Sequence, residues 1–255
     1  MSDAQAVPVD ALPVLAALRV ELARIERHAP VDGVAGLGDA VLDAALPWGG
    51  LRRGGLHEIA GAGHEAAASG FAAGLLARLL VPASEANASA HGMVLWCRLA
   101  RDGRERGVPY GPGLARFGLT PSRLILVETR RAAEALWAME EGLRCRRLVA
   151  VLGEGLPCDL VASRRLQLAA EAGGATALLV SHAAASASVA LSRWRVKPLP
   201  SRPLPGGGPG PPRWQVALWR CRGGGNGEWC VEWNDASRRF AVVAALADRP
   251  LAAAV

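Results

Sequence analysis

The middle of the chain alternates short apolar runs with helix-forming segments, and this alternation restricts the fold more than any other feature. The apolar runs predict strands at Leu56–Ala60, Met93–Cys97, Leu124–Glu128, Leu148–Leu152 and Ala175–Ser181. Helices are expected between them, in an Ala/Leu segment that ends near Leu80, over Ala132–Gly142 and over Ser163–Ala172. Continuous apolar strands separated by helices are typical of a parallel sheet with both faces covered. The sequence therefore predicts an α/β core.

The pattern changes after His182, where strand-like segments follow one another without helices between them. They lie at Ser192–Val196, Arg213–Arg222, Glu228–Asn234 and Phe240–Val243. A stretch dense in proline and glycine, 197–212, separates the first two, and Gly223–Gly227 predicts a hairpin turn between the next two. We expect a mostly parallel central sheet, flanked by helices and extended by C-terminal antiparallel strands.

Near the N-terminus, Leu15, Leu18, Leu22 and Ile25 recur at steps of three and four, which predicts an amphipathic helix over Leu12–Arg27. This helix either caps the core or docks on another protein as a helix in a groove. A chain of 255 residues favours one large domain. The expected organisation is a tail and helix over 1–35, a core over 36–245 that contains the 197–212 loop, and a tail over 246–255.

The formal net charge of +6 is carried almost entirely by arginine, because Lys197 is the only lysine. A mild basic excess fits contact with nucleic acid or acidic proteins without establishing either. The five cysteines form no C-x-x-C pair, so we expect reduced, buried thiols and no zinc ribbon or disulfide scaffold. No signal peptide or membrane-spanning stretch is evident, so a cytoplasmic location is expected.

The order strand, glycine turn and helix over Leu56–Leu80 is the layout of a nucleotide phosphate loop. Counting from Gly61, the G-x-x-x-x-G-K-[ST] pattern requires glycine, lysine and a hydroxyl at positions 66, 67 and 68. The chain has only alanine methyl groups there, and its one lysine is far away in sequence. We therefore predict a degenerate loop, no nucleotide cofactor and no ATPase activity, and the loop consists of Gly61, Gly63, Ala66, Ala67 and Ala68.

The acidic residues of an ATPase are also poorly placed in the sequence. Glu154 follows the strand Leu148–Leu152 only after an intervening glycine, and we interpret it as a solvated loop carboxylate rather than a displaced relic of a metal-holding acid. The strand Met93–Cys97 runs into Arg98 where an acid could activate water. His57 and Glu58 have no second histidine at helical spacing, so no metal site and no catalytic residue are predicted.

Several segments resemble known proteins. Asp43–Gly61 resembles the segment that leads into the phosphate loop of RecA recombinases, with a Gly-Gly-Leu turn before a G-x-h-x-E-h-x-G strand. The strands Ala190–Val196 and Arg213–Arg222 resemble the pair that follows the DNA-binding loops of RecA. The eroded loop is similar to that of the ImuA family, and further segments strengthen this resemblance: Ser192–Val196, Pro198–Ser201, Gly206–Gly210, Arg213-Trp214 and Gly227–Trp233.

The resemblance implies a RecA-like core that acts as a non-catalytic adaptor in the SOS response to DNA damage and supports error-prone translesion synthesis. The partners it implies are ImuB, which is a Y-family-polymerase-like protein, an error-prone replicative-type DNA polymerase, and RecA. Two alternatives stay open: a SulA-like inhibitor of a tubulin-like division protein, and a nucleotide-binding enzyme with an unconventional loop. Homo-oligomerisation also stays open.

Basic and aromatic residues interleave around the Pro/Gly loop, a chemistry suited to phosphate contact and base stacking. The candidates for partner or DNA contact are Arg193, Trp194, Arg195, Lys197, Arg202, Arg213, Trp214, Trp229 and Trp233. The competing interpretation is that the tryptophans pack inside the C-terminal sheet and that the cations line a solvated strand edge. Because the net charge is only +6, we expect weak, salt-sensitive DNA binding at most.

Overall fold

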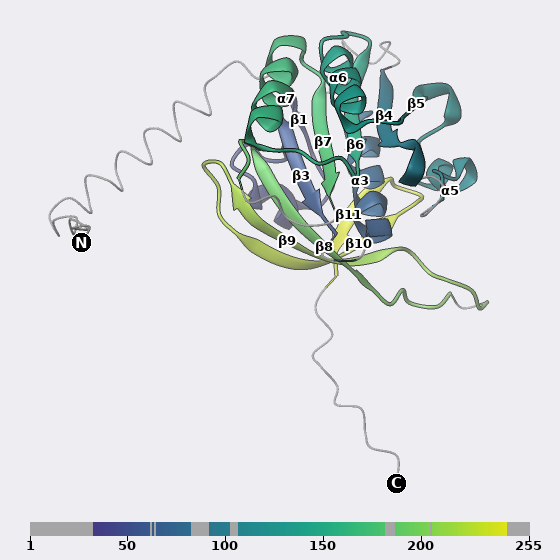
Figure 1. The fold of residues 1–255 in the computed structure, drawn as a ribbon. Coiled ribbons are helices and arrows are strands. Elements are labelled where there is room, and N and C mark those ends of the chain that lie inside the picture. Colours follow the sequence, from purple (N-terminus) through teal and green to yellow (C-terminus); the bar gives the residue numbers. More distant parts are fainter. Residues whose placement is uncertain are drawn as a thin grey trace, which may run out of the picture.

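The computed structural model describes residues 33–61, 63, 65–82, 92–102, 107–181, 187–204 and 206–243. The helix predicted over Leu12–Arg27 and the C-terminal tail lie outside these residues. Within them the chain folds around one large sheet, with a small two-stranded sheet, β1 (Val34–Ala35) and β2 (Leu51–Arg52), beside it (Figure 1).

The large sheet has nine strands in the order β11-β10-β9-β8-β3-β7-β6-β4-β5. The strands from β8 to β5 in this order are parallel, and β9, β10 and β11 extend the sheet antiparallel. This arrangement confirms the predicted fold class. The bounds are β3 Leu56–Ala60, β4 Met93–Leu99, β5 Leu124–Thr129, β6 Leu148–Glu154, β7 Thr176–Ser181, β8 Ser192–Leu199, β9 Arg213–Cys221, β10 Gly227–Asn234 and β11 Arg239–Val242.

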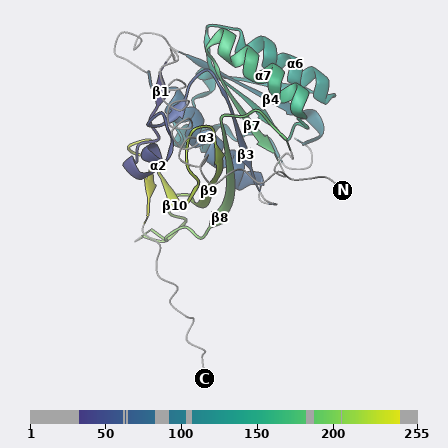
Figure 2. The ribbon, with the colours of Figure 1, turned by 90° about the vertical axis from the view of Figure 1, so that its left-hand side faces the viewer.

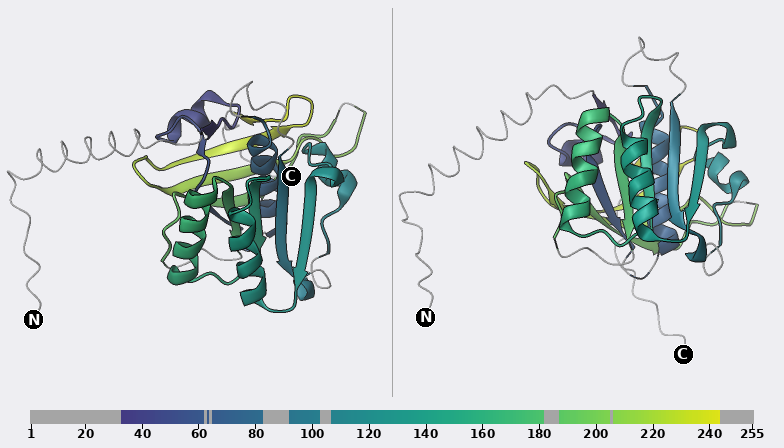
Figure 3. Two further views of the ribbon diagram at one scale, coloured as in Figure 1. Left: turned by 90° about the horizontal axis from the view of Figure 1, so that it is seen from above. Right: turned by 45° about the horizontal axis from the view of Figure 1, so that its top comes forward.

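Helices cover the two faces of this sheet unequally. On one face, α6 (Ala132–Leu143) packs on β4 and β6, and α7 (Leu160–Gly173) packs on β3 and β7. On the other face, α3 (Glu65–Leu79) crosses from β6 to β8 and reaches β11. Figures 2 and 3 show α6 and α7 side by side on the parallel half, with α3 on the opposite side. The short elements are α2 (Ala40–Ala45), α5 (Gly111–Arg116) and the 3-10 turn η3 (Pro121–Arg123).

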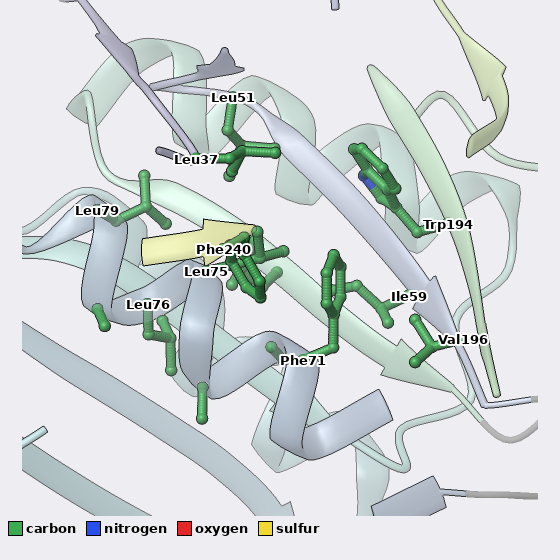
Figure 4. Close-up of a cluster of buried hydrophobic side chains, with 14 of the residues drawn as sticks. Leu37, Leu51, Ile59, Phe71, Leu75, Leu76, Leu79, Trp194, Val196 and Phe240 are labelled. Carbon is green, nitrogen blue, oxygen red and sulfur yellow. The ribbon is translucent and has the colours of Figure 1, made fainter. Parts of the chain in front are cut away.

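The core on the α3 side joins the parallel and antiparallel halves of the sheet. Residues 71–77 of α3 are all buried, so this stretch of the helix is enclosed on every side. Phe71 lies 5.9 Å from Trp194 and 5.0 Å from Phe240, measured between ring centroids. Figure 4 shows these three rings gathered between α3 and the strands. Trp214 and Trp233 complete the cluster through their own contacts with Phe240.

His57 is buried in β3 and is held by two hydrogen bonds. Its Nε2 lies 2.8 Å from the Arg52 carbonyl and its Nδ1 lies 2.6 Å from Ser192 Oγ. Since a carbonyl only accepts, Nε2 carries the proton and Nδ1 accepts from the serine, which in turn accepts from Trp194 Nε1 at 2.8 Å. Burial lowers the pKa of His57 from 6.5 to about 4, so the ring is neutral near neutral pH.

The buried imidazole predicts acid sensitivity. Because the pKa is about 4 in the folded chain and 6.5 in the unfolded chain, stability is lost as the pH falls from 6.5 toward 4. Between pH 7 and pH 5, His57 should remove about 2 kcal/mol from the free energy of unfolding. Urea unfolding at the two pH values measures this, with His57→Gln as the control that lacks the titrating group. An equal pH dependence in both proteins would contradict the assignment.

Two glycines of α3 provide a matched test of how tightly the core is packed. A Cβ at Gly74 would overlap the Phe240 ring, whereas a Cβ at Gly70 would meet Trp214 at 3.4 Å. We expect Gly74→Ala to lower the free energy of unfolding by about 1–3 kcal/mol through overpacking. Gly70→Ala should be neutral or should stabilise the protein by up to about 1 kcal/mol, because alanine is the better helix former. Similar effects at both sites would refute the packing argument.

Candidate functional site

The turn between β3 and α3 lies at the carboxyl edge of the parallel strands, where open α/β sheets bind ligands. Gly61 is buried there and its N–H donates to the Ser181 carbonyl at 3.1 Å, while Gly63 is exposed with a φ of +88°. The helix begins at Glu65, so the alanines at 66–68 lie in its first turn, with the third in the core. Methyl groups therefore fill the positions that a phosphate-binding lysine and hydroxyl would occupy.

Glu154 corrects one sequence prediction. It is the last residue of β6, not a solvated loop carboxylate, and it is partly buried. Ser69 Oγ donates to its Oε1 at 2.5 Å, and Trp96 Nε1 donates to its Oε2 at 3.0 Å. The sequence did not show that the strand continues through Gly153 and carries the carboxylate to the sheet edge. Its place at the end of an apolar strand fits the alternative interpretation, a displaced relic of a metal-holding acid.

Arg98 supplies the positive charge at this edge. Its side chain is 4% exposed, and the strand register aligns it with Glu128 on one neighbour and Glu154 on the other. Its Nε lies 3.7 Å from Glu128 Oε1 and its Nη1 lies 3.8 Å from Glu154 Oε2, while Nη2 donates to the Gly107 carbonyl at 2.7 Å. A guanidinium of the protein itself thus neutralises the carboxylates that could otherwise attract a divalent cation.

A pocket of about 310 Å³ opens beside this cluster. Trp96, Leu114 and Phe117 are apolar residues of its lining, and Arg98 and Glu154 also line it. Asp102 also lines the pocket, is 7% exposed, and has one carboxylate oxygen without a hydrogen bond among the residues described. The pocket is therefore mainly apolar with a few buried charges, a composition typical of binding sites for small groups.

A second, more open hollow of about 670 Å³ lies between the first turn of α3 and the Pro/Gly loop. Two arginines line it, but both are already paired within the chain. Arg116 contacts Asp235 at 2.7 Å, and Arg213 contacts Glu232 at 2.8 Å. Neither guanidinium replaces the missing lysine without breaking an ion pair, so the hollow offers little attraction for a triphosphate.

Three of the tryptophans predicted as contact residues are inside the protein. Trp194, Trp214 and Trp233 are at most 3% exposed and belong to the α3-side core. The prediction of surface contacts was wrong for them, because the even-numbered residues of β8, and those of β9 up to Leu218, face α3. Trp233 on β10 packs in the same core. Trp229 is partly buried against that core. The alternative interpretation, aromatic packing of the C-terminal sheet, is the one that the structure supports.

The predicted cations divide between the interior and the surface. Arg193 is 2% exposed and its Nε lies 2.8 Å from Glu58 Oε2, so it forms a buried ion pair and is not a surface contact residue as predicted. Arg195 and Lys197 follow on the same strand and are exposed. Arg202 is exposed in the loop and lies 3.8 Å from Glu232, which already holds the half-buried Arg213.

Trp219 is a partly exposed residue that the sequence did not mark as a contact candidate. Its ring lies beneath two guanidinium groups, with Arg193 Cζ 4.2 Å and Arg195 Cζ 5.7 Å from the ring centroid. A register irregularity between Arg193 and Trp194 aligns Trp194 with Leu218 and leaves Trp219 as an extra residue. A β-bulge of this kind redirects a side chain, and no residue pattern in the chain marks its place.

The cysteines fit the predicted buried thiols only in part. Cys97 and Cys221 are buried, Cys158 and Cys230 are partly buried, Cys145 is exposed, and all are free. Burial raises the pKa of Cys97 to about 12 and that of Cys221 to about 11. Burial, with smaller contributions from Glu58 and Asp159, raises the pKa of Cys158 to about 12. These three thiols are protonated near neutral pH and are poor nucleophiles.

The charge cluster at the sheet edge predicts a specific loss of stability. Replacing Arg98 with Met leaves Glu128 and Glu154 without their shared cation and should lower the free energy of unfolding by about 1–3 kcal/mol at pH 7. Urea unfolding at pH 7 measures this loss. The double variant R98M/E154Q should recover part of the loss, and a double variant as unstable as R98M would contradict the pairing.

Within the described ranges, no helix is long and apolar enough to cross a bilayer. No protein-family model matches the chain. Among solved structures, SulA from Pseudomonas aeruginosa is similar with 24% sequence identity and a TM-score of 0.38, covering 49% of this chain and 96% of that one.

Curated relatives give a closer match. Protein ImuA of Caulobacter vibrioides strain NA1000 / CB15N is 36% identical over 236 residues, covering 87% of this chain and 93% of the relative. Protein ImuA of strain ATCC 19089 / CIP 103742 / CB 15 matches with the same identity and coverage. Because the identity exceeds one third over nearly the whole length of these relatives, the chain belongs to the ImuA family.

Proposed function

We propose that this protein is a non-catalytic RecA-like adaptor in the SOS response to DNA damage, and that it supports error-prone translesion synthesis. Family membership supports the association with damage-induced mutagenesis. The partners that we propose are ImuB, an error-prone replicative-type DNA polymerase, and RecA. The adaptor acts through binding, so its contribution is to hold these proteins together at damaged DNA.

One observation carries the non-catalytic part of the proposal. The α/β core is intact, yet methyl groups occupy the phosphate-lysine position and Arg98 occupies the space between the carboxylates at the ends of β5 and β6. Phosphoryl transfer needs cations at the phosphates and an acid free to hold a metal ion or position water. The alanines at 66–68 provide no cation for a phosphate, and Arg98 pairs with Glu128 and Glu154, so neither of these carboxylates is free for that role.

Nucleotide independence is the direct test. We expect no heat of ATP binding with Mg²⁺ up to about 1 mM, because the loop sequence 61–68 has no lysine or arginine to offset the desolvation of a triphosphate. A pull-down of purified ImuB should recover the same amount of complex with ATP, with ADP and with EDTA. Micromolar ATP binding, or a complex that forms only with ATP, would contradict the proposal. A heat-denatured sample of this chain is the control for nonspecific capture.

A cell-based measurement separates the adaptor from the SulA-like alternative. Deleting the gene should lower the damage-induced mutation frequency without changing cell length. Overexpression should give the same fraction of filamentous cells as an empty vector. Filamentous cells on overexpression, together with an unchanged mutation frequency on deletion, would favour division inhibition and refute the adaptor.

A further inference from the structure

The C-terminal half of the large sheet has helices on only one face. Alternate residues of β8, β9, β10 and β11 point toward α3 and form the core. The opposite face continues the plane on which α6 and α7 pack, but those helices stop at β3. In the described part of the chain no helix covers this outer face, and Figures 1 and 2 show the strands curving past the helical layer.

The side of this outer face nearest the parallel strands is positively charged. Arg195 and Lys197 stand two residues apart on β8, which places both side chains on the same face about 7 Å from each other. Arg220 is exposed on β9 opposite Arg193. Among the residues described, none of the three exposed cations has an ion pair, so their charge is available to a ligand.

The carboxylates on the same face are already engaged. Glu228 accepts a hydrogen bond from Gln215, and Glu232 is paired with Arg213. They lie on β10, two strands away from β8. The acidic groups therefore do not neutralise the β8 cations directly, and a net positive strip runs along β8 and the bulged end of β9.

Trp219 gives this strip a defined geometry. Its ring supports the Arg195 guanidinium at 5.7 Å, and the other guanidinium above it belongs to the buried Arg193–Glu58 pair. A long exposed arginine loses less conformational freedom on binding when an aromatic ring already orients it. The guanidinium then presents N–H donors to a phosphate and a flat face on which a base can stack.

We propose that this strip, defined by Arg195, Lys197, Arg220 and Trp219, binds the backbone of single-stranded nucleic acid. Arg195, Lys197 and Arg220 contact phosphates, and Trp219 is a positioning residue for Arg195. The inference deepens the proposed function and relies on it only in preferring nucleic acid over an acidic protein segment. Of the residues predicted for DNA contact, it keeps the exposed Arg195 and Lys197 and leaves out the buried Arg193, Trp194 and Trp214.

The first test is binding of a fluorescein-labelled 20-nucleotide oligo-dT, followed by anisotropy in 50 mM salt. Arg195→Gln with Lys197→Gln should weaken binding at least tenfold and reduce the slope of log affinity against log salt by about 1.4, since each phosphate contact on a single strand contributes about 0.7. The matched control is Arg146→Gln with Arg147→Gln, which removes the same charge from exposed positions before β6. The control should bind within twofold of the unaltered protein.

The second test concerns Trp219. Trp219→Leu should weaken oligo-dT binding about threefold to fivefold while leaving the salt slope unchanged, because the cations remain but are less ordered. Trp219→Phe should restore most of the affinity, since a phenyl ring also supports a guanidinium. Circular dichroism and urea unfolding check that both variants are folded. Full affinity in a folded Trp219→Leu variant would refute the positioning role.

Further outcomes of these binding experiments test the location of the site and the kind of ligand. Equal loss of affinity in the double variant and its matched control would refute the location of the site. Duplex DNA binding as tightly as oligo-dT would refute the single-strand preference, and complete displacement by poly-glutamate at equal charge would assign the strip to an acidic protein. The ImuB pull-down should be unaffected by the double variant, so failure of this inference is distinguishable from failure of the adaptor.

Discussion

The burial of α3 is the constraint on which the rest of the structure depends. The helix starts at the carboxyl edge of the parallel strands, and its buried stretch packs on both halves of the sheet at once. Phe71 and Gly74 receive the aromatic rings of β8, β9, β10 and β11, and the small side chains around them allow the approach. The C-terminal strands are thereby fixed as part of one core, and no helix of the described residues covers their outer face.

The first turn of α3 also determines the chemistry at the carboxyl edge of the parallel strands. In its first turn, alanine methyl groups replace the groups that would hold phosphates, and further along Ser69 binds Glu154. Arg98 then compensates Glu154 and Glu128 from inside the protein. These features are electrostatically consistent. The loop contributes no lysine to bind phosphates, and the two carboxylates at the sheet edge are paired with a guanidinium of the protein itself.

The sequence predicted helices and strands well where the spacing of apolar residues and the residue types indicated the same element. The strands at β3 and β7 and the helix at α6 lie within one residue or so of their predicted bounds, because continuous apolar runs and amphipathic spacing are local signals. The site was predicted less well. Residue spacing grouped Arg193, Trp194 and Arg195 as one surface, yet a strand turns successive side chains to opposite faces. Which face is covered depends on α3, α6 and α7, whose positions no local pattern specifies.

From the order of its residues, this chain already determines an α/β core, a phosphate loop without lysine, and a C-terminal antiparallel extension, since each depends on residue type at a known spacing. Only the folded chain decides that Glu154 reaches the sheet edge and meets Arg98, and that Arg193 is buried while Arg195 is exposed over Trp219. The physical reason is that charge pairing and burial depend on distances between strands far apart in sequence. Those distances exist only after the sheet has assembled.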